Sequence, residues 1–234
     1  MNFVDIFILL VLAVCVLGGY YKGFLSTLVR IGMTLLSFFL ALSLSPLLSG
    51  AVRGQQDLYD MLLYYTEGSE YVAATDVELT RVGISQVTSE KLREVLRNAN
   101  MPIPMDTAVQ RNIAVEAFRA EGIGTLGDYF NRTIVAVTLN IFCVVLLFAL
   151  IRALTGVILG GIEYARGFPM LRQGDSLLGA ALGVLHGALF LFVIFMLLPV
   201  VLVVLPRVYT FISESYFGAF FYRANPFLRL VPDV

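Results

Sequence analysis

The sequence predicts an all-α integral membrane protein with four transmembrane helices. Hydrophobic residues make up 59% of the 234 residues and charged residues only 14%, whereas about a quarter of the residues in ordinary globular proteins are charged. Four apolar runs, over residues 4–21, 24–48, 133–151 and 177–205, are each near or above the roughly 20 residues that cross a bilayer as a helix. Because no run alternates with period two, we expect helices and not the strands of a barrel.

The first two runs are predicted to form a transmembrane hairpin over residues 1–48. Only the sequence GGYYKGF, with Lys22 at the turn, separates them, and so short a connection makes the two helices antiparallel neighbours. A cleavable signal peptide is the alternative for the first run. However, no basic residue precedes that run and no clean small-x-small cleavage site follows it. We therefore expect a retained span.

Residues 49–131 are predicted to form a long loop that contains amphipathic helices. Apolar residues recur at helical spacing in three places. These are Leu58, Met61, Leu62 and Tyr65, then Leu92, Val95 and Leu96, then Val109, Ile113 and Ala117. The loop is richer in acidic than in basic residues, which does not favour binding to anionic lipid. Its apolar faces are expected to pack together, to lie on the membrane or to meet a protein.

Residues 132–206 are predicted to carry the third and fourth spans with a cytoplasmic loop between them. The fourth run is longer than one crossing needs and contains Pro199, which predicts a tilt, a kink or an early exit there. Residues 207–234 are rich in Tyr and Phe, whose rings favour the bilayer interface. They predict a short interfacial C-terminal helix instead of a fifth span.

The distribution of Lys and Arg predicts the orientation in the membrane. Lys22 and Arg30 lie near the first short connection, and three arginines lie near the second, at positions 152, 166 and 172. The positive-inside rule places both connections in the cytoplasm, so that both termini and the long loop are predicted to be extracytoplasmic. Three arginines in the C-terminal tail, at positions 207, 223 and 229, argue for the opposite orientation.

The fourth run holds a face of glycines. Gly179, Gly183 and Gly187 recur every four residues, a spacing that lets another helix approach to backbone contact. Gly19 and Gly23 repeat the spacing in the first hairpin. Such a face serves either packing within one chain or self-association into a homo-oligomer, and we favour packing within the chain.

His186, the single histidine, lies beside the glycine face, where an ionisable group is a candidate functional residue. Two interpretations remain open. The ring is either a neutral imidazole hydrogen-bonded to a neighbouring helix, for example to Asn140 or to a Ser or Thr hydroxyl, or a gate that responds to protonation. Lys22, Arg30 and Asp175 are the other candidate functional polar residues.

The sequence lacks the motifs that would indicate catalysis, a cofactor or a metal. No HExxH, GxSxG or P-loop occurs, and Cys15 and Cys143 lie in separate apolar runs without a CxxC or Cys/His pattern. GIGTLG at residues 122–127 has the letters of the dinucleotide fingerprint but no preceding strand. A net charge of −1 without a basic stripe argues against nucleic-acid binding. We expect a non-enzymatic protein whose first partner is the lipid bilayer.

Three stretches resemble the colicin V production protein family of bacterial inner membranes. One is the tail SESYFGAFFYRANPFL, which is similar to the family's short aromatic C-terminal helix. The start FVDIFILLVLAV, with Asp5, and the turn at Lys22, Gly23 and Phe24 are similar to the family's first hairpin. GDSLLGAALGVLHGALFLF is similar to the family's fourth-span signature, in which an acidic residue precedes a Gly-x-x-x-Gly-x-x-basic-Gly run. The residues that match this signature in order are Asp175, Gly179, Gly183, His186 and Gly187.

The resemblance implies a multi-pass protein of the bacterial cytoplasmic membrane that serves toxin (bacteriocin) biosynthesis or export, or envelope maintenance. It implies an accessory or scaffold role, with a secretion or envelope protein as the expected partner. This chain departs from the family at His186, where the family has Arg or Lys, and at Ser26 and Thr27, where it commonly has a Glu. The alternative is an oligomeric channel or transporter subunit gated through His186.

Overall fold

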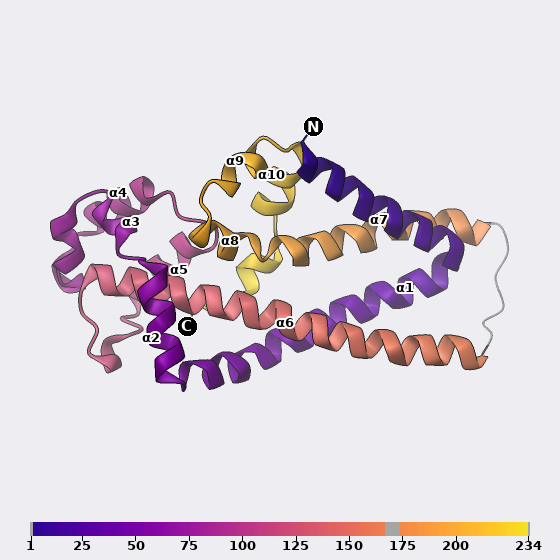
Figure 1. Ribbon diagram of the computed structural model, residues 1–234, viewed down its shortest axis with the longest axis horizontal. Helices are drawn as coiled ribbons and strands as arrows, with labels where there is room; N and C mark the ends of the chain where they lie inside the picture. Colours follow the sequence, from indigo (N-terminus) through magenta and orange to yellow (C-terminus); the bar gives the residue numbers. More distant parts are fainter. Residues whose placement is uncertain (1, 167–173, 234) are drawn as a thin grey trace. The chain divides into compact units, whose positions relative to one another are not determined.

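The computed structural model describes residues 2–166 and 174–233, and all regular elements within these ranges are helices (Figure 1). Three of the described helical stretches are long and apolar enough to cross a membrane, namely Phe3–Arg53, Leu126–Ile158 and Asp175–Val204. The all-α prediction is thus confirmed, and the three stretches are compatible with a multi-pass membrane protein. The chain folds into two compact units, a first unit (Met1–Ser45, Val144–Leu198, Arg207–Phe227) and a second unit (Pro46–Cys143, Pro199–Pro206, Leu228–Val234).

Helix α1, Phe3–Arg53, is broken at Gly23, whose backbone has φ 78° and ψ 176°. This conformation is essentially restricted to glycine. Positions on both sides of the break contact the same part of α7, Gly174–Phe195: Cys15 lies against Gly183, and the hydroxyl of Thr34 lies 3.1 Å from the ring of His186. The chain therefore turns back on itself at Gly23, as Figure 1 shows.

The part of α1 after the break buries one narrow face. Ile31, Thr34, Phe38, Ala41 and Ser45 are all buried, and their alternating spacing of three and four residues places them on one side of a helix. The hydroxyl groups on this face bond back to the carbonyl one turn earlier, as Thr34 does to Arg30 at 2.9 Å, so that they need no water.

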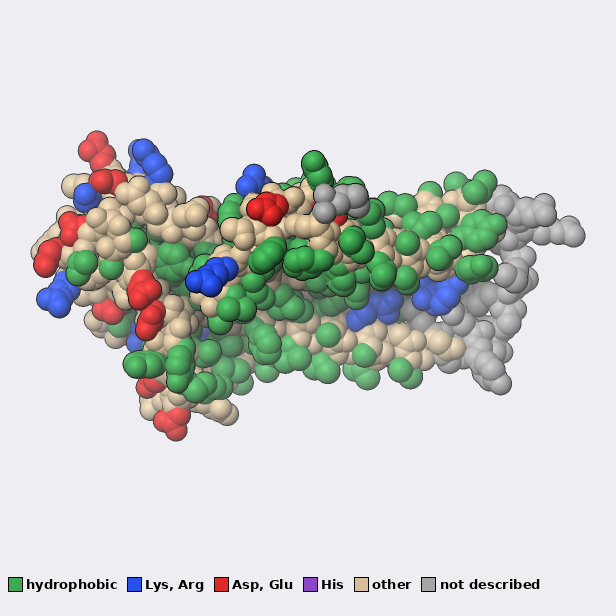
Figure 2. Space-filling model, turned by 45° about the horizontal axis from the view of Figure 1, so that its top comes forward, with side chains coloured by type: hydrophobic (Ala, Val, Ile, Leu, Met, Phe, Trp, Pro, Cys, Tyr) green, Lys and Arg blue, Asp and Glu red, His purple; other side chains and the backbone are tan. Residues whose placement is uncertain are grey.

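The opposite face of the long helices is apolar and exposed. Large apolar residues in all three helices expose more than half of their surface: Leu36 and Leu47 in α1, Leu154 and Val157 in α6 (Leu126–Arg166), and Leu177 in α7. In Figure 2 hydrophobic side chains cover much of the visible surface of the long helices, whereas most of the visible acidic side chains gather over the helices between α1 and α6. Extended exposed apolar surface of this kind is typical of helices that face lipid.

Helix α6, Leu126–Arg166, is longer than the third predicted span at both ends. It begins before residue 133 because Thr125 and Asp128 cap it. The backbone amide of Asp128 donates to the Thr125 hydroxyl at 3.3 Å, and that hydroxyl donates to the Asp128 carboxylate at 2.6 Å. At its other end the helix continues to Arg166, into residues predicted as a cytoplasmic loop. The rest of that loop, with Arg172, lies outside the described residues.

The fourth predicted span is interrupted where Pro199 predicts an interruption. Helix α7 ends at Phe195, and α8, Leu198–Val204, begins one residue before Pro199. A proline fits the first turn of a helix because the amides there have no partner within the helix. The break therefore sits at the start of α8.

Helices occupy all three stretches of the long loop where the apolar spacing predicts them. They are α2 (Gln56–Thr66), α4 (Ser89–Ala99) and α5 (Met105–Ala114), with α3 (Glu70–Ala73) and 3₁₀ turns at Val77–Arg81, Ile84–Gln86 and Arg119–Glu121 between or after them. Ala117 lies beyond the end of α5. A buried cluster joins α3, α4 and α5 to the start of α6. It is formed by Val72, Val95, Leu96, Val109, Leu126 and Phe130.

The C-terminal tail differs from the single interfacial helix that the sequence predicts. It forms α9 (Val208–Ser213), α10 (Tyr216–Arg223) and a 3₁₀ turn at Phe227–Leu230. Phe221 and Phe227 are buried and lie against other aromatic rings of the first unit, with ring centroids 5.0 Å apart for Phe192 and Phe221 and 4.1 Å apart for Phe38 and Phe227. Aromatic composition alone did not separate rings that face the protein from exposed ones such as Tyr216.

Candidate functional site

The glycine face of α7 is in backbone contact with the first part of α1. A Cβ atom at Gly183 would lie 2.5 Å from the carbonyl oxygen of Cys15, and one at Gly179 would lie 2.3 Å from that of Gly19. At Gly187 the nearest atom would belong to the side chain of Leu12, at 3.0 Å. Gly179 and Gly183 thus lie where two helices approach too closely for any side chain. Within the chain, α1 occupies the face.

Asp175 and Gly23 form one feature at the turn of the hairpin. The Oδ1 atom of Asp175 accepts a hydrogen bond of 2.8 Å from the backbone amide of Phe24. Phe24 is the first residue after the break at Gly23, so its amide lacks the partner that an unbroken helix would give it. Asp175 therefore caps the second part of α1. Lys22 is exposed beside this break.

His186 bonds to Thr34, and not to Asn140. The Nε2 atom of the ring lies 3.1 Å from the Thr34 hydroxyl, which itself donates to the carbonyl of Arg30 at 2.9 Å. A threonine hydroxyl has one hydrogen to donate, so Nε2–H is the donor in the bond to Thr34. Arg30 and Arg152 also lie close enough to act electrostatically on the ring. The structure thus brings His186 and Arg30 together, and adds Arg152, which the sequence indicated only as a determinant of orientation.

Replacing Thr34 with Val should destabilise the protein by about 1 to 2 kcal/mol, because the N–H of the half-buried His186 ring would lose its acceptor. Thr34→Ser retains the hydroxyl and should cost less. The free energy of unfolding, measured by SDS titration in mixed micelles with circular dichroism, compares the two variants. Equal losses for Val and Ser would mean that the hydrogen bond between Thr34 and His186 contributes nothing.

A second polar cluster ties the start of α1 to the tail. The carboxylate of Asp5 accepts hydrogen bonds from the hydroxyl of Ser215 at 2.7 Å, the amide of Phe217 at 3.0 Å and the amide of Asn2 at 3.0 Å. Both Asp5 and Ser215 are buried, and Ser215 also caps α10 by accepting from the amide of Gly218 at 2.8 Å. A lone carboxylate in an apolar run was the signal for this site, but nothing in the sequence indicated its partner.

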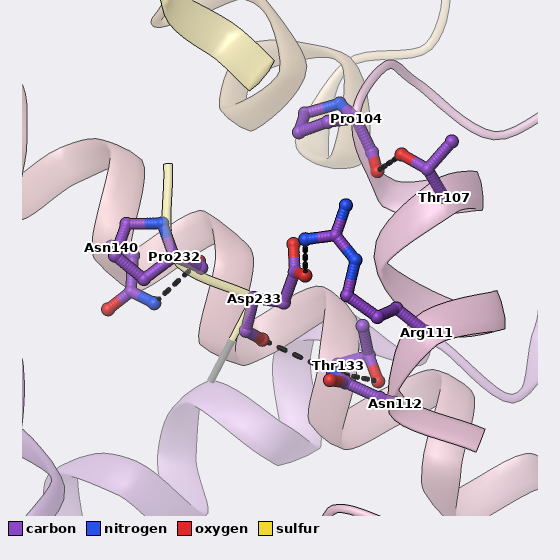
Figure 3. Close-up of polar contacts among 8 residues, drawn as sticks. All are labelled: Pro104, Thr107, Arg111, Asn112, Thr133, Asn140, Pro232 and Asp233. Carbon is purple, nitrogen blue, oxygen red and sulfur yellow. Dashed lines mark hydrogen bonds and ion pairs between the residues drawn. The ribbon is translucent and has the colours of Figure 1, made fainter. Parts of the chain in front are cut away.

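A third polar cluster, in the second unit, holds the last described residues (Figure 3). The side-chain amide of Asn140 donates to the carbonyl of Pro232 at 2.9 Å, and that of Asn112 donates to the carbonyl of Asp233 at 3.2 Å. Arg111 forms an ion pair with the Asp233 carboxylate. Two asparagines and an arginine thus bind an irregular backbone segment whose carbonyls have no helical partners.

The same cluster continues beyond the residues that bind the tail. The Nδ2 atom of Asn112 also donates to the Thr133 hydroxyl at 3.1 Å, and the Oδ1 atom of Asn140 accepts from Arg53 at 3.3 Å. Asn112 and Asn140 are each only 1% exposed, so these contacts replace bonds to water. The sequence alone did not indicate this cluster, although an asparagine in an apolar run such as Asn140 was a usable signal.

The described residues show no group of three His, Cys, Asp or Glu side chains that could hold a metal ion. The GIGTLG stretch pairs with residues 82–84: the amide of Ile84 donates to the carbonyl of Gly124 at 2.8 Å, and the amide of Leu126 donates to that of Val82 at 2.9 Å. It thus forms an ordered connection between 3₁₀ turns and α6, without the strand that a dinucleotide site needs.

The chain matches no protein-family model, no curated protein and no solved structure. Its resemblance to the colicin V production family stays a prediction from the sequence.

Proposed function

We propose that the protein crosses the bacterial cytoplasmic membrane four times and acts as an accessory or scaffold protein in toxin export or envelope maintenance. The break at Gly23, capped by Asp175, is the observation that carries this proposal. It divides the 51 residues of α1 into two parts, each of which is long enough for a crossing. The residues that make this turn and the glycine face are those that resemble the family.

The second unit supports a scaffold role. Its helices α3 to α5 pack around a core of their own, which includes Val72, Val95 and Val109. The outer side of α4 carries exposed charges, among them Arg93 and Arg97. An ordered surface of this kind is suited to binding a protein partner.

Affinity purification of the tagged protein from its native membrane in a mild detergent tests the proposal. We expect a stoichiometric secretion or envelope protein, identified by mass spectrometry. Reversing the charges of α4 with Arg93→Glu and Arg97→Glu should release it, whereas Arg207→Glu, in the tail, should not. A homo-oligomer of defined size without a partner would contradict the scaffold role.

A channel or transporter subunit is the alternative, and the position of His186 near Arg30 and Arg152 favours it, because ionisable groups within spans often mark ion pathways. Flux into liposomes that disappears in His186→Ala would support this alternative. Flux that the substitution leaves unchanged would exclude His186 as the gate.

Cysteine labelling should reveal four crossings. In a background with Cys15→Ser and Cys143→Ser, an impermeant maleimide should label Glu67→Cys from outside the cell, and should label Lys22→Cys only after the membrane is opened. This follows because the two positions lie at opposite ends of the second predicted span. Labelling of Lys22→Cys from outside, with Glu67→Cys labelled only after the membrane is opened, would invert the topology. Failure to label Lys22→Cys even after the membrane is opened would mean that α1 crosses only once.

A further inference from the structure

Helix α2 differs from the other amphipathic helices of the second unit because it buries none of its residues. Val95 in α4 and Val109 in α5 are completely buried. In α2, by contrast, Met61 is 48% exposed and Tyr65 is 76% exposed. The apolar face of α2, formed by Leu58, Met61, Leu62 and Tyr65, is thus less covered by the described residues, and within it only Leu62 is half-buried.

The opposite side of α2 is fixed to the start of α6. The side chain of Asn131 donates to the carbonyl of Leu63 at 3.2 Å and accepts from the amide of Gly68 at 2.9 Å. The guanidinium of Arg132 lies over the ring of Tyr59, 5.8 Å from its centroid. Burial raises the pKa of the Tyr59 phenol, although the positive charges of Arg132 and Arg53 act to lower it. Since these contacts hold the side of α2 that carries Tyr59 and Leu63, Met61 and Tyr65 are held outward.

The position of α2 in the chain indicates what this face meets. Helix α1 ends at Arg53 and α2 begins at Gln56, so that two residues join them. Two residues span at most about 7 Å. Because α1 has the length and composition of a membrane-spanning helix, α2 must begin near the boundary between membrane and water.

We propose that α2 lies in the interface of the leaflet at which α1 ends, with Leu58, Met61, Leu62 and Tyr65 inserted among the lipids. An amphipathic helix with aromatic residues binds such an interface through its apolar face. The helix carries Asp57 and Asp60 and no Lys or Arg, so its lipid partner is zwitterionic and not anionic. This inference rests on the membrane-spanning character of α1, and not on a role in toxin export.

Tryptophan fluorescence provides the test, because the chain contains no tryptophan and a single substitution gives an unambiguous signal. The full-length Met61→Trp variant is reconstituted into phosphatidylcholine vesicles with bromine at shallow or deep positions of the acyl chains. The matched control is Asp60→Trp, about 100° from Met61 and about 140° from Tyr65 around the same helix. Tyr65→Trp, an exchange of aromatic rings, repeats the measurement with less risk to folding.

Lipid insertion predicts blue-shifted emission for Met61→Trp and Tyr65→Trp, several-fold stronger quenching than in Asp60→Trp, and more quenching by shallow than by deep bromine. Addition of phosphatidylglycerol should not increase the quenching. Equal quenching at positions 60 and 61 would overturn the proposal. A blue shift that occurs without bromine quenching and that grows with the ratio of protein to lipid would also overturn it. That result would mean that a second copy of the chain covers the face. Neither outcome affects the labelling at Lys22 and Glu67.

Discussion

Gly183→Val should severely disrupt the packing of α7 on α1. The added Cβ atom alone would lie 2.5 Å from the carbonyl oxygen of Cys15 and 2.8 Å from the Cα atom of Val16. Both are backbone atoms, so the helices must separate to make room. Overpacking of a well-packed interior typically costs about 1 to 3 kcal/mol, and we expect a loss at or above the upper end. SDS titration of the reconstituted protein measures it.

The neighbouring glycines provide controls of opposite sign. A Cβ atom at Gly18 or Gly32 would have no other atom within 4 Å. Gly18→Ala and Gly32→Ala should therefore stabilise the helix by about 0.5 to 1 kcal/mol, the difference in helix propensity between the two residues. Gly19→Ala, one position from the first control, should destabilise, because its Cβ atom would lie 2.1 Å from the carbonyl oxygen of Gly179. Similar values for Gly18→Ala and Gly19→Ala would contradict the packing described.

Asn140→Leu should destabilise the second unit by about 2 kcal/mol or more, although it makes α6 more apolar. The substitution removes the donor to the Pro232 carbonyl and the acceptor for Arg53, and each buried group left without a partner costs about 1 to 3 kcal/mol. The unfolding free energy is again the measurement. Release of the tail should also appear as faster proteolysis around Pro232.

Thr138→Val is the matched control on the same helix. The hydroxyl of Thr138 is buried and has no hydrogen-bond partner among the described residues. Its replacement by the isosteric Val removes a polar group that is costly to bury, and should leave the stability unchanged or raise it. If Thr138→Val and Asn140→Leu had the same effect, loss of polarity in α6 and not loss of the tail contacts would be the cause.

The sequence indicated the helices because hydropathy and spacing are local properties. The long apolar runs, the break near Pro199 and the amphipathic stretches around Leu92 and Val109 all depend on residues within one or two turns of each other. The glycine face was visible for the same reason, since Gly179 and Gly183 are one turn apart. Gly23 was noted as a packing residue, but its positive φ required the structure.

The polar partners were not visible because they lie far apart in the chain. Thr34 and His186 are separated by 152 positions, and Asn140 and Pro232 by 92. No periodic pattern links such residues, so the sequence could offer Asn140 as a partner for His186 without any means of testing the choice. The extent of α6 was missed for a different reason: the capping pair Thr125 and Asp128 extends the helix beyond its apolar run.

The bond between Asp5 and Ser215 also has a consequence for biosynthesis. The two residues are 210 positions apart, so a ribosome makes the carboxylate long before it makes the hydroxyl and the Phe217 amide that bind it. When the first hairpin is synthesised, Asp5 therefore still lacks these two donors, and closure of the first unit has to wait until α10 has been synthesised. Native contacts of such long range form late, which makes the tail the last step in assembly of the bundle.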